Sequence, residues 1–132
     1  LHASVVRIRP TPIPSAEASY GDFNAAAQEL RTICDMANVF DMELHVICRP
    51  GTLTDTPEST RRLLKMANCR NCKCSWQPNT AISDQDNLMQ LQSLKEYLGS
   101  AVANASWKKE YGTYLENTLP NVPVILEQGR IS

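Results

Sequence analysis

Three cysteines stand close together in the sequence, at Cys69, Cys72 and Cys74. A C-x-x-C pair can place two thiolates on one tetrahedral zinc ion, and a third nearby cysteine adds a further ligand. Cys48 is the fourth ligand that we predict, with His45 as its alternative. No second C-x-x-C or H-x-H half accompanies the motif. The spacing therefore predicts a structural zinc site of Cys48, Cys69, Cys72 and Cys74, although half of the usual pattern is missing.

Two other uses of these cysteines compete with zinc. In an oxidising compartment, Cys34 and Cys48 would each pair with a member of the cluster, which leaves one of the five cysteines unpaired. In a reducing compartment, Cys69 and Cys72 would act as a redox pair whose basic neighbours lower a thiol pKa. A redox C-x-x-C usually opens a helix, whereas this one follows a predicted helix. Inert free thiols are the remaining interpretation.

A second feature is the segment from Arg49 to Thr54, which connects a predicted strand to a predicted helix. Ligands of open α/β sheets collect at the carboxyl ends of strands, and helix N-termini attract anions. Arg49 supplies charge, Gly51 allows a close backbone approach, and Thr52 and Thr54 offer hydroxyl groups. The segment matches no known phosphate-binding motif, and Asp55 adds a charge of the wrong sign. We therefore predict a weak anion site at Arg49, Gly51, Thr52 and Thr54, with an ordinary connecting loop as the simpler interpretation.

Acid–base and nucleophilic catalysis are poorly supplied. The chain has two histidines, His2 near its start and His45 within a predicted strand, where a packing role is favoured. No G-x-S-x-G or H-E-x-x-H motif occurs. The sequence therefore provides no candidate catalytic residue.

Composition is that of one ordinary globular domain. The chain has 132 residues, of which 42% are hydrophobic, with 13 basic and 14 acidic side chains. This balance lacks the basic surface that binds phosphate backbones, so it argues against a nucleic-acid partner. No stretch approaches the ~20 apolar residues of a membrane-spanning helix. We expect a single domain over 1–132, with a proline-containing loop at 10–20 and a cysteine-rich connection at 68–82. The chain begins at Leu1 rather than Met, as expected of a processed product or a fragment.

Hydrophobic spacing predicts the elements that would position these residues. Alternating or continuous apolar runs predict strands at 4–9 and 42–48, a short strand at 74–76 and a last, edge strand at 122–128, where Pro123 lies. Apolar residues at helical spacing predict a helix over 22–37 capped by Asp22, and a second helix from Asp55 in which Pro57 occupies the first turn. A third stretch begins at Ser83. Its helical spacing continues to 105 and, after a change of phase, to 115, which predicts one bent helix or two consecutive helices.

This order of elements predicts an α/β fold with a small, mostly parallel sheet of three to four strands and four or so helices. The alternatives are an α+β arrangement and a mostly helical bundle. With no catalytic motif present, we favour a non-catalytic module that binds a protein partner. A secreted, disulfide-stabilised factor acting on a receptor is one alternative. An enzyme using the Arg49–Thr54 loop or the Cys69–Cys72 pair is the other.

Overall fold

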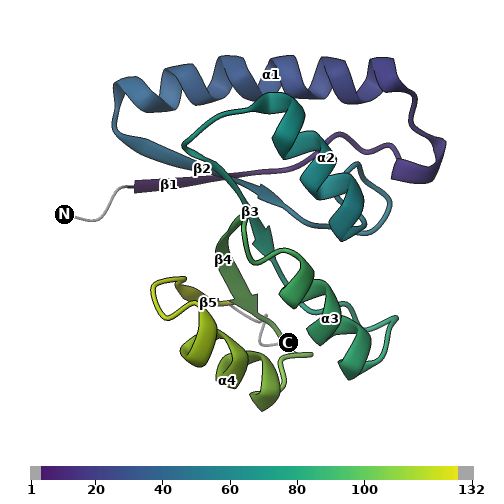
Figure 1. Ribbon diagram of the computed structural model, residues 1–132, viewed down its shortest axis with the longest axis vertical. Coiled ribbons are helices and arrows are strands. Elements are labelled where there is room, and N and C mark those ends of the chain that lie inside the picture. The colour runs from purple at the N-terminus through teal and green to yellow at the C-terminus, as the bar shows by residue number, and fades with distance from the viewer. Residues whose placement is uncertain (1–3, 128–132) are drawn as a thin grey trace, which may run out of the picture.

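The computed structural model describes residues 4–127. Strands and helices alternate along this part of the chain (Figure 1). They are β1 (Ser4–Ile8), η1 (Ser15–Glu17), α1 (Tyr20–Val39), β2 (Met42–Ile47), α2 (Pro57–Ala67), β3 (Cys72–Trp76), α3 (Asp84–Ser93), β4 (Leu98–Ala103), α4 (Lys109–Thr118) and β5 (Val124–Leu126).

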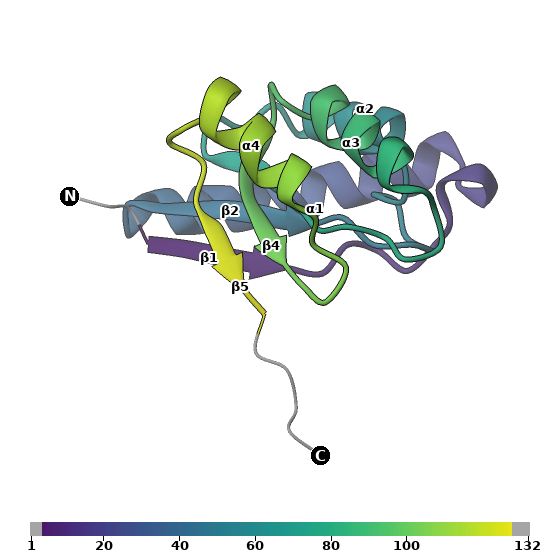
Figure 2. The ribbon, with the colours of Figure 1, turned by 90° about the horizontal axis from the view of Figure 1, so that it is seen from below.

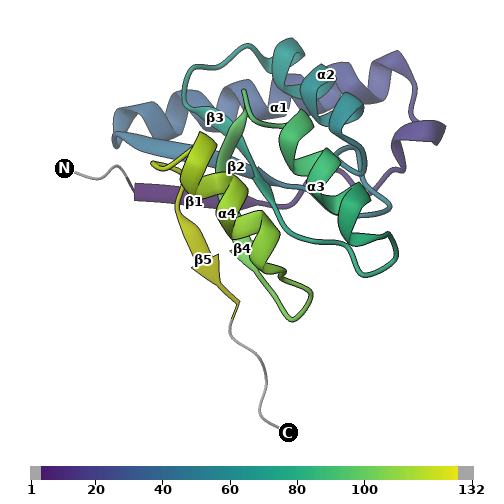
Figure 3. The same ribbon diagram turned by 60° about the horizontal axis from the view of Figure 1, so that its bottom comes forward.

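The five strands form one parallel sheet in the order β1-β2-β3-β4-β5. The four α-helices cover one side of it (Figure 2). The sheet is strongly curled, so that β5 crosses the direction of β1 steeply and the other side becomes concave (Figure 3). The architecture is therefore a parallel half-barrel. The predicted α/β fold is confirmed, and the helical-bundle alternative is wrong.

The first two helices begin at caps that lie one to three residues from the predicted ones. Ser19, not Asp22, caps α1, and Asp22 completes the capping box by accepting a hydrogen bond from the Ser19 amide. In the same way, α2 is capped by Thr56 rather than Asp55, with Pro57 in the first turn as predicted. In both cases a hydroxyl side chain within three residues of the predicted aspartate accepts the hydrogen bond from the first turn.

The fourth strand was not predicted. Helical spacing through Leu94, Leu98 and Val102 indicated a helix, but α3 ends at Ser93 and residues Leu98–Ala103 form β4. The spacing is misleading because β4 is buried on both faces, so apolar residues occur without strict alternation. Gly99 and Ser100, both weak helix formers, mark the true break.

The main core lies between the sheet and the helices. It contains the side chains of alternate strand residues, such as Leu44, Val46 and Cys74, packed against Phe23 and Leu30 of α1. The predicted inner face of this helix is thus confirmed, with Ile33 partly buried beside it. Within residues 4–127, no helix is both long and apolar enough to cross a membrane.

Candidate active site at the carboxyl ends of the strands

Side chains alternate between the two faces of the sheet, which assigns each strand residue to a face. Val6, Ile8, Leu44, Val46 and Ala101 pack into the core under the helices. The residues between them therefore belong to the concave face. Continuing the alternation to the carboxyl end of each strand brings one polar residue per strand to the mouth of the half-barrel. We call this set the strand-end ring: Arg9, Arg49, Gln77, Asn104 and Glu127.

Backbone pairing supports this alignment beyond the formal strand ends. The Cys48 amide donates to the Ser75 carbonyl (2.9 Å), so β2 stays in register up to the residue before Arg49. The Glu127 amide donates to the Ala103 carbonyl (3.0 Å), which extends β5 in the same way. Parallel sheets bind their ligands at this edge, because the connecting loops there are free to differ.

A cavity of about 270 Å³ opens at the ends of β2, β3 and β4. Arg49, Gln77 and Asn104 of the strand-end ring line it, together with Asp55, Trp76 and residues of α2 and α3, among them Thr60 and Gln90. Trp76 is 1% exposed and packs edge-on against Tyr111 in the core, with ring centroids 5.4 Å apart. The cavity thus combines a cationic, an amide and a carboxylate group with one apolar surface, a composition typical of small-ligand sites.

One carboxamide and one carboxylate of the cavity also hold its loops in place. Asn104 donates from Nδ2 to the Pro78 carbonyl (3.1 Å) and accepts from the Ser106 amide (3.0 Å), which ties the ends of β3 and β4 together. Asp55 accepts from the Ser15 amide (3.1 Å). Arg49 and Gln77 have no such structural hydrogen bond within residues 4–127, and they remain available to a ligand.

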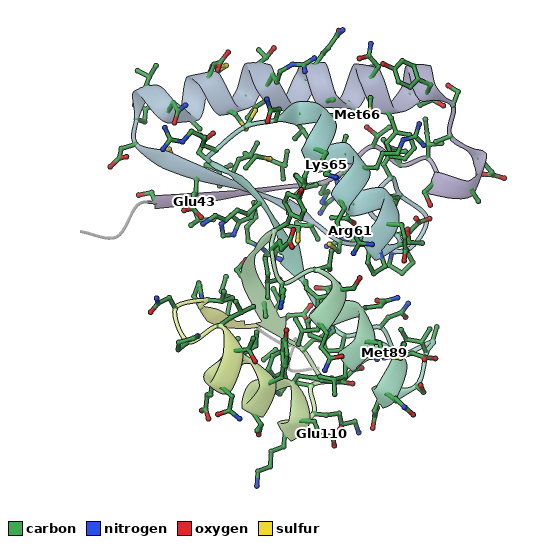
Figure 4. The ribbon with its side chains drawn as sticks, in the orientation of Figure 1. Glu43, Arg61, Lys65, Met66, Met89 and Glu110 are labelled. Atoms are coloured by element: carbon green, nitrogen blue, oxygen red, sulfur yellow. The ribbon has the colours of Figure 1, made fainter. Side chains whose placement is uncertain are left out.

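A buried polar network lies on the concave face below the ring. His45 is 1% exposed; its Nδ1 lies 2.9 Å from Ser100 Oγ and its Nε2 lies 2.8 Å from Glu43 Oε1. Ser100 donates to Ser75 (3.0 Å), and the Lys73 ammonium lies 3.3 Å from Glu43. Glu43 is near the start of β2 (Figure 4), at the end of the sheet opposite to the mouth. With each member paired, the network joins three strands and leaves His45 a packing histidine, as predicted.

The predicted anion loop divides into structural and exposed residues. Thr52 donates to the Arg49 carbonyl (2.7 Å) and Thr54 donates to the Ile47 carbonyl (2.8 Å), so both hydroxyls shape the loop from inside. Gly51 has a φ of 75°, a left-handed conformation that favours glycine. Arg49 alone faces the cavity as an exposed charge. Anion binding at this loop stays a prediction, and Arg49 is the residue of the loop that would bind the anion.

The predicted cysteine cluster is separated in the structure. Cys72 begins β3 and pairs in register with Leu44, whereas Cys48 follows β2 four residues later, about 13 Å along the strand. The Cys34 thiol meets Cys69 and Cys72, and the Cys74 thiol meets Cys48. Four thiolates cannot surround one zinc ion at bond lengths near 2.3 Å from these positions. The single cluster of Cys48, Cys69, Cys72 and Cys74 is therefore corrected to two smaller contacts.

The disulfide interpretation is corrected as well, because all five cysteines are free thiols. Residues 4–127 contain no group of three or more His, Cys, Asp or Glu side chains arranged to hold a metal ion. The strand-end ring offers one carboxylate and two amides next to two guanidinium groups. Divalent cations take carboxylate, imidazole or carbonyl ligands, and nearby positive charge opposes them. The ring in this part of the chain does not fit a resident divalent cation.

Comparisons with known proteins point to one fold. No protein-family profile matches the sequence, and a search of characterised proteins finds no relative. Solved structures do match. The probable 3-DHS dehydratase AsbF of Bacillus anthracis superposes with a TM-score of 0.77 at 18% identity, over 95% of this chain and 57% of that one. The D-allulose 3-epimerase of Methylomonas sp. gives 0.74 at 12% identity, over 96% and 50%. The 3-keto-D-glucoside 4-epimerase YcjR of E. coli gives 0.65 at 15% identity, over 97% and 56%.

These structures are TIM-barrel-like, and the chain spans about half the length of each. The half-barrel of this chain thus has the fold of part of a TIM barrel, whose reactions occur at the carboxyl ends of the strands. Two of them are epimerases, of D-allulose and of a 3-keto-D-glucoside, and the third is described as a probable 3-DHS dehydratase. The non-catalytic interaction module that we favoured from the sequence is therefore corrected, as is the secreted disulfide-stabilised factor. The enzyme alternative is the one to develop, and the predicted protein partner stays a prediction.

Sequence reasoning missed four of the five ring residues: Arg9, Gln77, Asn104 and Glu127. None belongs to a motif, and each is a single polar residue just after a strand. The signal was their shared position, which becomes visible only when β4 is recognised as a strand and the five strand ends are aligned.

Proposed function

We propose that the chain carries part of the active site of an enzyme that moves a proton next to the carbonyl group of a sugar-like compound. One observation carries this proposal: each strand of the parallel sheet contributes one polar residue at the edge where TIM-barrel enzymes react. The fold neighbours support it, because epimerisation and dehydration of a hydroxylated carbonyl compound can share one step, removal of the proton beside the carbonyl.

Glu127 is the general base of this proposal. It is the only carboxylate in the strand-end ring, and its backbone is held to β4 by the bond to Ala103. Its carboxylate takes the proton from the carbon, so the C–H bond breaks and an O–H bond forms on Glu127. The electron pair moves to the carbonyl oxygen, where an enediolate charge develops.

Arg49 and Gln77 are the donors that stabilise this charge. Both lie on the cavity wall and neither donates to a structural acceptor within residues 4–127. Donors that are already in place when charge develops contribute a large part of catalysis.

Solvent deuterium exchange tests the proposal. The intact protein is incubated with D-allulose, D-fructose or D-tagatose in D2O, and loss of the proton signal beside the carbonyl is followed by NMR. We expect Glu127→Gln to slow exchange roughly 100-fold or more, since it removes the base. Glu116→Gln, at an exposed position on α4, is the matched control and should exchange at the parent rate. Equal exchange by the Glu127→Gln variant would show that Glu127 is not the base.

A further inference from the structure

The charge on the mouth of the half-barrel differs from that of the chain as a whole. The chain has a formal net charge of −1. The strand-end ring nevertheless contains two arginines, Arg9 and Arg49, against the single carboxylate of Glu127. Within residues 4–127, neither arginine forms an ion pair with an acidic side chain. Two guanidinium groups at neighbouring strand ends thus lack an ion-pair partner in this part of the chain.

The two arginines follow neighbouring strands of the sheet. Ile8 pairs with Val46, which places Arg9 level with Ile47, and Arg49 follows two residues further along the neighbouring strand. Adjacent strands are ~4.8 Å apart, so both side chains start from the same side of the mouth. Arginine binds carboxylate and phosphate groups through two parallel hydrogen bonds, which makes it the usual residue for oxyanions.

Acidic side chains near the mouth do not form ion pairs with these arginines. The Asp55 carboxylate lines the same cavity as Arg49 and accepts hydrogen bonds from the Ser15 amide and the Ser59 hydroxyl (3.5 Å). Glu29 lines a second cavity together with Arg9. Within residues 4–127, neither carboxylate pairs with an arginine of the mouth. A ligand in the mouth therefore meets two guanidinium groups without an ion-pair partner on the β1–β2 side and the Glu127 carboxylate on the β5 side.

We infer that the substrate of this site is an anionic sugar derivative, whose carboxylate or phosphate group is bound by Arg9 and Arg49. The inference rests on the proposed function and specifies its substrate class. The anionic group binds on the β1–β2 side of the mouth, and the reacting carbonyl group lies between it and Glu127. Arg49 and Gln77 lie on one cavity wall and donate to the carbonyl oxygen as well, as the proposed function requires.

Titration calorimetry with three probes tests the inference. The intact protein is titrated at low ionic strength with D-gluconate, D-glucose 6-phosphate and neutral D-glucitol. We expect at least one anionic probe to bind 10-fold or more tightly than D-glucitol. Preference for D-gluconate assigns a carboxylate, and preference for D-glucose 6-phosphate assigns a phosphate. Equal binding of all three, or no binding of either anion, overturns the inference.

Variants then locate the bound charge. Arg9→Gln and Arg49→Gln should each weaken binding of the preferred anion about 10-fold and leave D-glucitol unchanged, and Arg49→Lys should restore part of the loss. Arg70→Gln is the control, since Arg70 is exposed in the turn before β3, at the opposite end of the sheet. If Arg70→Gln weakens binding as much as Arg49→Gln, the effect is general charge and the site assignment is wrong. Circular dichroism of each variant shows that the fold is kept.

The two proposals fail in different ways. If neutral ketoses exchange their proton with solvent and the anionic probes bind no better, the substrate class is wrong and the proposed chemistry stands. If an anionic probe binds through Arg9 and Arg49 while no sugar undergoes exchange, the proposed chemistry is wrong and the anion site stands.

Discussion

The imidazole ring of His45, on β2, lies directly against the backbone of Gly99, on β4. A Cβ atom added to Gly99 would be 2.6 Å from Cε1 and 2.8 Å from Cδ2 of His45, closer than real Cβ contacts. The absence of a side chain at residue 99 is what allows His45 to reach Ser100 and Glu43 at once. This small residue in β4 and the buried histidine in β2 therefore depend on each other.

The Gly99→Ala variant should lose ~1–3 kcal/mol of unfolding free energy, because His45 must move out of its hydrogen bonds to make room. Denaturant unfolding measures the loss. In Gly99→Ala/His45→Ala the clash disappears, so the two substitutions together should cost less than the sum of the single ones. Gly112→Ala, where the nearest side-chain atom is 3.8 Å away within α4, is the control and should be neutral or slightly stabilising. Additive losses at residues 99 and 45 would argue against the dependence.

The Glu43 carboxylate makes stability depend on pH. Burial alone would raise the pKa of Glu43, but the hydrogen bond from His45 and the charge of Lys73 outweigh burial and hold the pKa below its ordinary value. A lowered pKa stabilises the fold above the pKa of the unfolded chain, and this stabilisation is lost as pH falls through the folded-state pKa. Unfolding free energies between about pH 3 and 6 should therefore vary less in Glu43→Gln. Lys73→Met should reduce the same dependence partially, and an unchanged profile in both variants would contradict this account.

Replacing Leu30 by Ala should destabilise the domain by ~2–5 kcal/mol, because Leu30 is buried in the core between α1 and the sheet. Chemical denaturation gives the value. Gln28→Ala, at an exposed position of the same helix, should change stability by less than ~0.5 kcal/mol. A loss at Leu30 as small as that at Gln28 would show that this face of α1 is not packed.

Thiol reactivity should separate the cysteines into two groups. Burial raises the pKa of Cys34, and it raises the pKa of Cys72 to about 11; contact with Cys48, followed by burial, raises the pKa of Cys74. These three thiols stay protonated at neutral pH, while Cys48 and Cys69 are half-exposed. With a thiol reagent at pH 8 we expect two fast and three slow reactions, and five fast ones after unfolding. Cys48→Ser/Cys69→Ser should lose the fast phase. Five equal rates in the folded protein would contradict the burial of Cys34, Cys72 and Cys74.

The raised Cys72 pKa also has a consequence in alkali. A thiol whose pKa is higher in the folded state favours folding up to the pKa of the unfolded chain, near 9.0, and that contribution is lost as pH rises towards 11. Stability should therefore fall over this range, and the fall should be smaller in Cys72→Ala than in the parent protein, as measured by denaturation at each pH.

Local sequence patterns were sufficient for most of the fold. The β-branched residues around Val6 and the continuous apolar run around Val46 identified β1 and β2. Ser83 was recognised as the start of α3, which it caps by accepting a hydrogen bond from the Asp86 amide. Such signals depend on neighbouring residues only. Local patterns did not identify β4, because Leu94, Leu98 and Val102 repeat at the four-residue spacing of a helix by coincidence. Since β4 is buried on both faces, its sequence also lacks the apolar–polar alternation that would have indicated a strand.

The candidate site was much harder to predict because it depends on long-range register. Cys48 and Cys72 are compatible with one site in the linear sequence, yet the parallel pairing of β2 and β3 sends them to opposite ends of the sheet. The same pairing brings Arg49 and Gln77 together, which no spacing rule indicates. Thr52 and Thr54 have hydroxyl groups that could bind an anion, but these groups donate to backbone carbonyls within the loop instead.

The layered concave face has a consequence for how this fold can change over time. The buried polar network holds β2, β3 and β4 together near their middle and amino ends. Its members are Glu43, His45, Lys73, Ser75 and Ser100. Of the strand-end ring, only Asn104 also holds the backbone, through Pro78. Arg9, Arg49, Gln77 and Glu127 can therefore be exchanged at little cost in stability. Substitutions at these positions can therefore alter the chemistry of the site without unfolding the protein. A library restricted to these four positions should contain many folded variants with altered specificity.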